Sequence, residues 1–339
     1  MIVLNLIPKV MGYKLFRYFN IPGLYPFNLT ISVTNRCNSK CKTCNIWKEK
    51  YEDLSLEEWH KILKSIGKCP IWVTISGGEP FLREDLVSIV RMISKYNKPY
   101  ILNIATNGIL TNKIESDIKE ILSFYNGNLI VNVSMDGVND KHDFIRGIKC
   151  FNNVLETYNK LRKLDNLTIG MHTVISKYNV KDIPKIYGFF KKLNLDSFIC
   201  EIAENREELK NINMDIAPSD SEYFKAIDFL LNKNGKGKRI SKLTKLLRKR
   251  YYKLTKDILK EKKAILPCYA GMASAHVNFK GDLWACCIKC ETFGNLRKNG
   301  FKELWFSEKA NKIRDKIKNK ECYCTLANAS YSNIICGLL

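Results

Sequence analysis

Three cysteines stand close together in the stretch TNRCNSKCKTCNIW, at Cys37, Cys41 and Cys44. A structural zinc site usually takes four Cys or His ligands, arranged as two pairs separated by a longer loop. Iron–sulfur clusters are also usually held by four thiolates. The next Cys or His along the chain is His60, which lies inside a segment with helical periodicity. Three thiolates therefore leave one metal position open to a substrate or cofactor, as in catalytic metal sites.

Four polar or Gly-rich motifs each come at the end of an apolar, β-rich run. The cysteine loop follows the run at 29–33, SGGEP (76–80) ends the run at 71–76, ATNG (105–108) ends the run at 100–106, and SMDG (134–137) ends the run at 129–135. A single Gly-Gly is most often only a turn, but the same placement at four strand ends favours one shared site. Ligands of α/β proteins bind at the carboxyl ends of parallel strands.

The elements that position these motifs follow from periodicity. Two further β-rich runs lie at 167–175 and 196–203, and helical segments are expected near 55–66, 84–96, 112–124, 151–164 and 180–193. The first helix opens with a capping box, Ser55-x-x-Glu58. Six βα units in series predict a parallel sheet. Six strands are too few for a closed eight-stranded barrel, so we expect an α/β fold with a partial (β/α)6 barrel over residues 28–203.

The cysteine loop, GGEP, ATNG and SMDG, in this order and spacing, resemble the radical S-adenosylmethionine superfamily over about residues 28–203. The resemblance implies that Cys37, Cys41 and Cys44 hold a 4Fe-4S cluster. It also implies that S-adenosylmethionine chelates the fourth iron and is cleaved reductively to a 5′-deoxyadenosyl radical. The residue before the third cysteine is commonly aromatic in this superfamily and is Thr43 here. Ile46 or Trp47 is an alternative source of adenine contacts, although a Trp near a strand end is more often part of the core.

The same resemblance implies further cofactor-binding residues. They are Gly77, Gly78 and Glu79 for the methionyl amino group, Asn107 and Ser134 for the ribose hydroxyls, and Arg146 for the methionyl carboxylate. A guanidinium fork suits a carboxylate. The alternative role for Arg146 is a surface ion pair with Asp143, and Asp136 alternatively only caps a turn.

The end of the chain is again rich in cysteine. Cys268, Gly281 and Cys286 fit a C-x12-G-x4-C arrangement, which resembles the SPASM and twitch extensions that carry auxiliary iron–sulfur clusters. The full seven-cysteine SPASM pattern is incomplete, so this resemblance implies one auxiliary 4Fe-4S cluster rather than two. The expected ligands are Cys268, Cys286, Cys322 and Cys324, with Cys287, Cys290 and Cys336 as alternatives. Cys69, Cys150 and Cys200 are most simply small buried hydrophobic residues.

Four segments are expected: an amphipathic amino-terminal segment (1–27), the barrel (28–203), a basic helical connector (204–266) and the auxiliary cluster domain (267–339). Residues 236–263 hold thirteen Lys or Arg against two acidic residues, with apolar side chains at helical spacing. Such a helix either lies on an anionic membrane or phosphate-bearing ligand, or packs its apolar stripe on the domain and leaves its lysines in water. Tyr251 and Tyr252 are too few aromatic residues to argue for nucleic acid, so no nucleic-acid partner is expected.

Composition limits the setting. The 339-residue chain has 13 Cys and a formal net charge of +22. Lys9, Lys14 and Arg17 interrupt the apolar amino-terminal stretch, so no signal peptide is expected and clustered cysteines indicate metal in a reducing cytoplasm. No apolar run approaches the roughly 20 residues that cross a bilayer. The chain is therefore expected in the cytoplasm, at most peripheral to a membrane. The charge favours an anionic partner or is a solvated surface.

Two classes of function remain. The first is a radical enzyme that abstracts hydrogen from a small-molecule, lipid-linked or peptide substrate, with a reductant such as ferredoxin or flavodoxin. The basic helix and the apolar amino-terminal segment favour an anionic or lipid- or sugar-linked substrate. The 27 residues before the first strand are too few for a leader-binding module, which argues against a leader-guided peptide. The second class is a non-catalytic iron–sulfur protein that transfers electrons or senses redox state.

Overall fold

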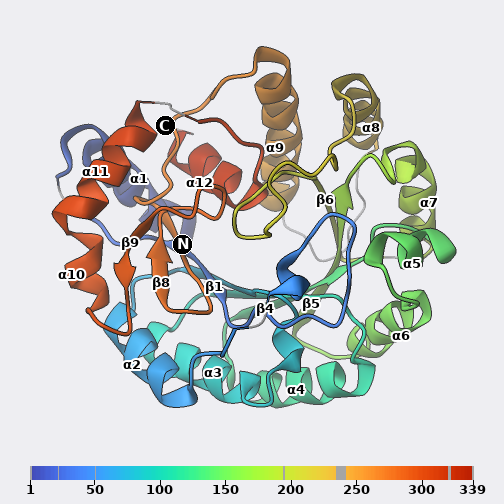
Figure 1. Ribbon diagram of the computed structural model, residues 1–339, viewed down its shortest axis with the longest axis horizontal. Helices are drawn as coiled ribbons and strands as arrows, with labels where there is room; N and C mark the ends of the chain where they lie inside the picture. Colours follow the sequence, from blue (N-terminus) through green and yellow to red (C-terminus); the bar gives the residue numbers. More distant parts are fainter. Residues whose placement is uncertain are drawn as a thin grey trace.

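A computed structural model describes residues 2–21, 23–49, 51–193, 195–233, 242–319 and 322–337. Its centre is one curved nine-stranded sheet, with strand order β6-β5-β4-β3-β2-β1-β7-β8-β9, and helices surround the sheet (Figure 1). The strands are β1 (Asn28–Ser32), β2 (Trp72–Ser76), β3 (Ile101–Thr106), β4 (Asn128–Ser134), β5 (Leu167–Ile175), β6 (Ser197–Ile202), β7 (Ser274–Val277), β8 (Asp282–Trp284) and β9 (Thr292–Asn295).

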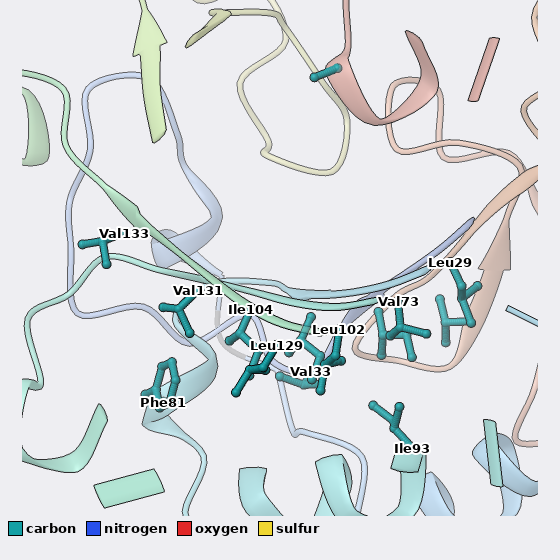
Figure 2. Close-up of a cluster of buried hydrophobic side chains, with 14 of the residues drawn as sticks. Leu29, Val33, Val73, Phe81, Ile93, Leu102, Ile104, Leu129, Val131 and Val133 are labelled. Atoms are coloured by element: carbon teal, nitrogen blue, oxygen red, sulfur yellow. The ribbon is translucent and has the colours of Figure 1, made fainter. Parts of the chain in front are cut away.

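The first six strands are the predicted ones, and all neighbouring pairs among them are parallel. Their side chains alternate between two faces, as the pleat requires. Apolar side chains such as Val73, Leu102 and Leu129 are fully or almost fully buried and point from the sheet toward the surrounding helices (Figure 2). The intervening residues are often polar, and Asn132 Nδ2 donates to Asn103 Oδ1 across β3 and β4 at 2.7 Å. The concave face of the sheet therefore carries polar groups.

The helices are α1 (Ile2–Phe19), α2 (Leu56–Ile66), α3 (Leu86–Met92), α4 (Thr111–Phe124), α5 (Asp140–Arg146), α6 (Phe151–Leu161), α7 (Ile183–Leu193), α8 (Asp220–Asn232), α9 (Lys242–Glu261), α10 (Phe301–Trp305), α11 (Glu308–Lys318) and α12 (Ala327–Gly337). The predicted capping box opens α2: Glu58 N donates to Ser55 Oγ at 3.1 Å and Ser55 N to Glu58 Oε2 at 2.8 Å. Helix α5 was not predicted. It supplies Arg146 to the site described below.

The carboxyl-terminal strands extend the barrel sheet instead of forming a sheet of their own. β7 pairs in parallel with β1, so that Asn28 lies opposite Ser274, and β8 and β9 follow as antiparallel strands. Helix α12 is tied to the same strand, because Asn28 Nδ2 donates to Ser332 Oγ at 3.1 Å. Strand β1, which leads into the cysteine loop, is therefore held on one side by the barrel and on the other by the carboxyl-terminal region.

The basic helix predicted over 236–263 appears as α9, and its first six residues lie outside the described part of the chain. Tyr251, Tyr252, Leu254 and Ile258 are at least nine-tenths buried, so the apolar stripe packs on the protein and the lysines face water. Arg248 also faces inward, with Nη1 donating to the backbone oxygen of Phe198 at the start of β6. The structure thus adopts the second of the two expected roles for this segment.

Helix α1 has two different faces. Tyr13 and Phe16 are buried in an apolar cluster with Tyr269 and Met272 of the carboxyl-terminal region. In contrast, Met11, Leu15, Tyr18 and Phe19 are 46–68% exposed. Among the described residues, no helix combines the length and the apolar character needed to cross a membrane.

Candidate functional site

The cysteine loop leaves the carboxyl end of β1 and brings its three thiols together. The Cys37, Cys41 and Cys44 side chains are close enough for each to influence the ionisation of its neighbours. Backbone N–H groups point at two of the sulfurs: Ser39 N donates to Cys37 Sγ and Ile46 N to Cys44 Sγ, both at 3.5 Å. Such donors stabilise thiolates that ligate metal. The loop therefore has the chemistry of an iron–sulfur ligand set.

Burial makes these thiols weak acids when they carry no metal. It raises the pKa of Cys37 to about 11 and that of Cys44 to about 12, and it also raises the pKa of Cys41 although the Arg146 guanidinium opposes the shift. Because the metal ligand is the thiolate, cluster assembly must displace these protons.

The spacing of the thiols argues against a single ion. In a tetrahedral zinc site with Zn–S bonds of about 2.3 Å, sulfur atoms lie about 4 Å apart. Within the described chain, the groups of three donors that lie within 4.8 Å of one another are His142, Asp143 and Cys150, and Glu208, His276 and Cys287. The loop cysteines form no such tight group, which fits a larger cluster.

Gly77 and Gly78 pack against the cysteine loop itself. A Cβ on Gly77 would lie 2.2 Å from the Thr34 backbone oxygen, and one on Gly78 would lie 2.1 Å from the Arg36 backbone oxygen. Gly77 also has φ of +128°, which L side chains rarely adopt. Gly78 N donates to Thr34 O and Glu79 N to Arg36 O, both at 2.8 Å. The two glycines are thus required by the close approach of two strand-end loops.

Glu79 is fully buried and joins the second and third strand ends. Its carboxylate accepts from Thr106 Oγ1 at 2.9 Å, from Asn107 N at 2.6 Å and from Phe81 N at 3.2 Å. Burial raises the pKa of Glu79 to about 7, although these hydrogen bonds oppose the shift. Its predicted contact with the methionyl amino group stays a prediction, to which the structure adds a positioning role.

Asn107 and Ser134 lie at the ends of β3 and β4. The Asn107 amide is already engaged by the cysteine loop, with Nδ2 donating to Asn38 Oδ1 at 2.6 Å and to Ser39 Oγ at 3.2 Å. Ser134 is partly exposed at the last position of β4. Their predicted ribose contacts remain predictions, and Asn107 also stabilises the loop.

Helix α5 places Arg146 against the cysteine loop. The chain is fixed there by Lys40 N donating to Arg146 O at 3.0 Å and Lys42 N donating to Ile145 O at 2.9 Å. Arg146 Nη1 lies 3.7 Å from Cys41 Sγ, and Nη2 pairs with Asp136 Oδ2 at 2.8 Å. The Arg146 Nε atom is buried without a hydrogen-bond partner among the described residues, so the guanidinium retains a donor for a carboxylate.

The alternative roles considered for the two aspartates are wrong. Asp143 does not pair with Arg146: its carboxylate accepts from the backbone N–H groups of Cys150 and Phe151, both at 2.8 Å, and so begins α6. Asp136 is the ion-pair partner of Arg146 and also accepts from Val174 N at 2.8 Å.

Trp47 is partly exposed rather than a core residue, and its Nε1 donates to Cys44 O at 3.0 Å.

A second group of thiols lies in the carboxyl-terminal region. This group consists of Cys268, Cys286, Cys322 and Cys324, which lie close enough for a negative charge on one thiol to raise the pKa of others. The main cause of the raised pKa values is burial, and the pKa of Cys268 is about 12. Backbone N–H groups of Ala270 and Leu326 donate to Cys268 and Cys324. These four are the predicted auxiliary ligands, and the assignment stays a prediction that their proximity supports.

The remaining cysteines differ in their surroundings. Cys290 Sγ contacts Cys287 O at 3.4 Å, and Cys287 lies beside Glu208 and His276. Cys336 is fully buried in the apolar cluster that includes Tyr13 and Phe16 of α1. Cys150 and Cys200 are buried in the main core, and the partly buried Cys69 packs against it. Cys69 and Cys200 thus pack as small apolar side chains do, whereas Cys150 also lies beside His142 and Asp143.

The loop between β6 and α8, residues 203–219, connects the two thiol groups. On one side, Asn45 N donates to Leu209 O at 2.9 Å and Asn211 Nδ2 donates to Thr43 O at 2.8 Å. On the other side, Glu207 N donates to Ile288 O at 3.1 Å. We call this segment the β6–α8 loop. It lies between the cysteine loop at residues 37–44 and residues 286–290.

Charged residues of this loop and of the neighbouring strand ends were not predicted as site residues. His172 Nε2 lies 3.1 Å from Glu201 Oε1, and Arg206 Nη2 lies 3.7 Å from Glu201 Oε2. Glu204 Oε1 accepts from Thr325, while Glu204 Oε2 and Arg206 Nε are buried and unpartnered among the described residues. The sequence ENREELK follows the sixth strand directly, so the strand-end rule could have identified it.

Comparison with known proteins agrees with this geometry. A model of the radical SAM superfamily matches residues 31–190, and a model of the SPASM iron–sulfur cluster-binding domain matches residues 268–325. The chain is 32% identical over 198 residues to the GTP 3′,8-cyclase of Aliarcobacter butzleri, covering 55% of this chain and 59% of the relative. The match therefore spans less than two thirds of that protein.

A longer alignment relates the chain to the Fe-coproporphyrin III synthase of Methanosarcina barkeri, with 24% identity over 315 residues, 86% of this chain and 76% of the relative. Among solved structures, Streptococcus suis SuiB bound to its precursor peptide SuiA has a TM-score of 0.65 at 16% identity, covering 92% of this chain and 71% of that chain. At that identity the likeness concerns the fold.

Proposed function

This chain is a radical S-adenosylmethionine enzyme with a SPASM iron–sulfur domain, and we propose that it abstracts a hydrogen atom from a polar substrate held on the concave face of its sheet. The observation that carries the proposal is the convergence of the cysteine loop, the Gly77–Glu79 turn and Arg146 at neighbouring strand ends. A purely electron-transferring protein has no need for this second set of residues around its thiols.

When bound to a 4Fe-4S cluster and reduced by one electron, S-adenosylmethionine supplies a 5′-deoxyadenosyl radical. The chain's own contribution is to bind and orient. Cys37, Cys41 and Cys44 hold the cluster, Arg146 offers its unpartnered Nε to the methionyl carboxylate, and the Gly77–Glu79 turn fixes the loop. The β6–α8 loop and the carboxyl-terminal region cover the strand ends, which keeps water from a reactive site.

The substrate is proposed to carry an anionic group. Arg206 and His172 present positive or hydrogen-donating groups, and Arg206 Nε is buried without a partner among the described residues. Two relatives are named for reactions of GTP and Fe-coproporphyrin III, compounds that carry phosphates and carboxylates respectively. Lipid-linked and sugar-linked anions belong to the same class. A peptide substrate is the alternative, and the likeness to SuiB does not separate the two because it concerns the fold.

We propose Glu204 as the group that receives a proton from that substrate. Its Oε2 is buried and unpartnered among the described residues, while Oε1 is fixed by Thr325. The Glu204 carboxylate also lies near Cys324 of the predicted auxiliary site. Burial is the main cause of the raised pKa of the Cys324 thiol, and the negative charge of Glu204 raises this pKa further. A substrate that loses a proton here would do so beside the second cluster.

The test is formation of 5′-deoxyadenosine. Anaerobically reconstituted protein receives S-adenosylmethionine and dithionite, and the nucleoside is measured by mass spectrometry. We expect a C37A/C41A/C44A variant to lose the product while keeping iron in the carboxyl-terminal region, and a C69A control to keep the activity. Cleavage by the triple variant would refute the assignment of the loop. A wild-type protein that binds clusters but never forms the nucleoside would favour the non-catalytic class.

Contact with a membrane surface is also proposed, through α1 rather than through α9. The apolar stripe of α9 is buried, whereas Met11, Leu15, Tyr18 and Phe19 of α1 are exposed. Interfacial helices insert such faces among lipid headgroups. We expect wild-type protein to sediment with acidic vesicles and an M11E/L15E/Y18E variant to stay in the supernatant. Equal behaviour of the two proteins would exclude this contact.

A further inference from the structure

We propose that the surface over the catalytic cysteine loop is the docking site for a small acidic electron-carrier protein. This inference rests on the proposed function, because the loop must receive one electron for each S-adenosylmethionine it cleaves. The carrier loses that electron and the bound cluster gains it, so no atom is transferred at the surface. The surface consists of Lys40, Lys42, Trp47, Lys48 and Phe144, and we call it the loop patch.

The loop patch is adjacent to the thiols. Lys40 and Lys42 flank Cys41 in the sequence, and Trp47 Nε1 donates to Cys44 O at 3.0 Å. The backbone N–H groups of Lys40 and Lys42 bind the last turn of α5, which carries Phe144. Residues of this patch are therefore next to Cys41 in the sequence and hydrogen-bonded to the backbone of Cys44. An electron entering here would meet residues that are adjacent to two of the three cysteines in the chain.

The patch combines two aromatic side chains with three lysines. Phe144 is 51% exposed, and Lys42 Nζ lies 4.4 Å from the centre of its ring. Lys40 Nζ and Lys48 Nζ lie 5.8 and 5.4 Å from the Trp47 ring. Interfaces of weak redox encounters are small, with an aromatic or apolar centre and a charged rim.

The lysines of the patch form no ion pairs with other described residues of the protein. Throughout the part of the chain that the structure describes, Lys40, Lys42 and Lys48 form no salt bridge, whereas the neighbouring Arg36 pairs with Asp53. Three unpaired ammonium groups around two aromatic rings complement an acidic surface. Complementary charge accelerates association and makes it sensitive to salt.

The position also separates the carrier from the substrate. The inner side of the cysteine loop is covered by the β6–α8 loop, which contacts Thr43 and Asn45. Lys40, Lys42 and Phe144 of the loop patch lie on the α5 side of the same loop, where the backbone of Lys40 and Lys42 binds Arg146 and Ile145. A carrier can therefore dock and leave while the substrate stays enclosed.

The experiment compares two sources of electrons. Full-length reconstituted protein, a K40E/K42E variant and a K245E/K249E control receive either reduced ferredoxin or flavodoxin, or dithionite, and 5′-deoxyadenosine formation is followed. Lys245 and Lys249 are exposed on α9, so the control makes the same change of charge elsewhere. We expect K40E/K42E to raise the carrier concentration for half-maximal rate at least tenfold, after the rate of each protein has been divided by its own dithionite rate to correct for any change in cluster loading. The control should match wild type in both assays.

A direct binding measurement keeps the inference testable if no cleavage occurs. Carrier binding to the reconstituted proteins is measured by fluorescence anisotropy at two salt concentrations, and we expect K40E/K42E alone to lose the salt-sensitive binding. Equal carrier binding by all three proteins would overturn the docking site, as would equal losses in K40E/K42E and the α9 control. Loss of binding to acidic vesicles with unchanged carrier binding would assign the patch to a membrane and overturn it too. Absence of cleavage with dithionite in wild type would instead contradict the proposed function.

Discussion

Glu79 is a buried carboxylate whose protonation couples the site to stability. The pKa of Glu79 is raised by burial from its ordinary value of 4.5 to about 7 in the folded chain. Between these two pKa values the folded state binds more protons than the unfolded state. The free energy of unfolding therefore falls as pH rises through this window. Above pH 7 the contribution of Glu79 to the free energy of unfolding changes little. From pH 5.5 to 7.5 the expected loss is about 2 kcal/mol.

The measurement is thermal unfolding of the reconstituted protein under argon at several pH values, with E79Q as the matched control. Because the Gln side chain does not titrate, the wild-type protein should lose stability relative to E79Q as pH rises. Parallel pH profiles for the two proteins would contradict the raised pKa.

Arg146 combines a structural ion pair with a free donor, and the two roles can be separated. Its partner Asp136 is 3% exposed, so R146Q leaves a buried carboxylate unpaired and should cost about 3 kcal/mol of stability. The double variant D136N/R146Q removes both charges and should recover much of that loss. If Arg146 also binds the methionyl carboxylate, both variants should bind S-adenosylmethionine at least tenfold more weakly, as measured by calorimetry. Recovery of affinity in the double variant would restrict Arg146 to a structural role.

At the scale of elements, the site depends on two loops that approach closely. Replacing Gly77 or Gly78 by Ala brings a Cβ within 2.2 Å of a backbone oxygen of the cysteine loop, which cannot retreat without displacing the thiols. We expect a loss of about 3 kcal/mol or more and reduced iron content after reconstitution.

The matched control is G188A in α7, where a new Cβ meets nothing within 4 Å. This change should stabilise the protein by about 1 kcal/mol because Ala favours a helix over Gly. The check is the midpoint of thermal unfolding together with the iron content. A G77A protein as stable and as iron-rich as G188A would show that the two loops do not need their close approach.

The sequence predicts some elements well, for identifiable physical reasons. The strand at 167–175 was predicted with its observed bounds because nine β-rich residues with few interruptions give a strong signal. Helix α5 was missed because seven residues are too few to show a helical period. Strands β7 to β9 are three or four residues long, and the pairing of β7 with β1 joins residues far apart in the sequence. No local pattern contains that information.

For the site, too, the sequence predicts features that are local and misses those that depend on how distant segments fold together. Cys37, Cys41 and Cys44 could be predicted as cluster ligands because their spacing is local. The ion pair of Arg146 with Asp136 was not found, since it depends on how α5 turns back over the cysteine loop. His172 and Glu201 were not proposed because each is ordinary in the sequence and only the pairing of β5 with β6 brings them together. Arg206 directly follows the sixth strand, where the strand-end rule could have identified it.

For the whole molecule, the number of clusters is the simplest quantity to measure. The catalytic loop accounts for four iron atoms, and one complete auxiliary site for four more, so we expect about eight iron and eight sulfide per chain. A C268A/C286A/C322A variant should retain about four, as measured by iron and sulfide analysis after anaerobic reconstitution. A wild-type value near twelve would restore a second auxiliary cluster. A value near four would mean that the carboxyl-terminal thiols hold none.

The pairing of β7 with β1 also has a consequence during synthesis. One edge of β1 is completed only by β7, which is translated roughly 240 residues later, about 12 to 50 s at ordinary ribosomal rates. Until then the nascent chain presents an unpaired strand edge next to three free thiols, a surface prone to pairing with other chains. Expression should therefore depend on chaperones that act on ribosome-bound chains. A product truncated before β7 should accumulate as insoluble material, although it contains all six predicted barrel strands.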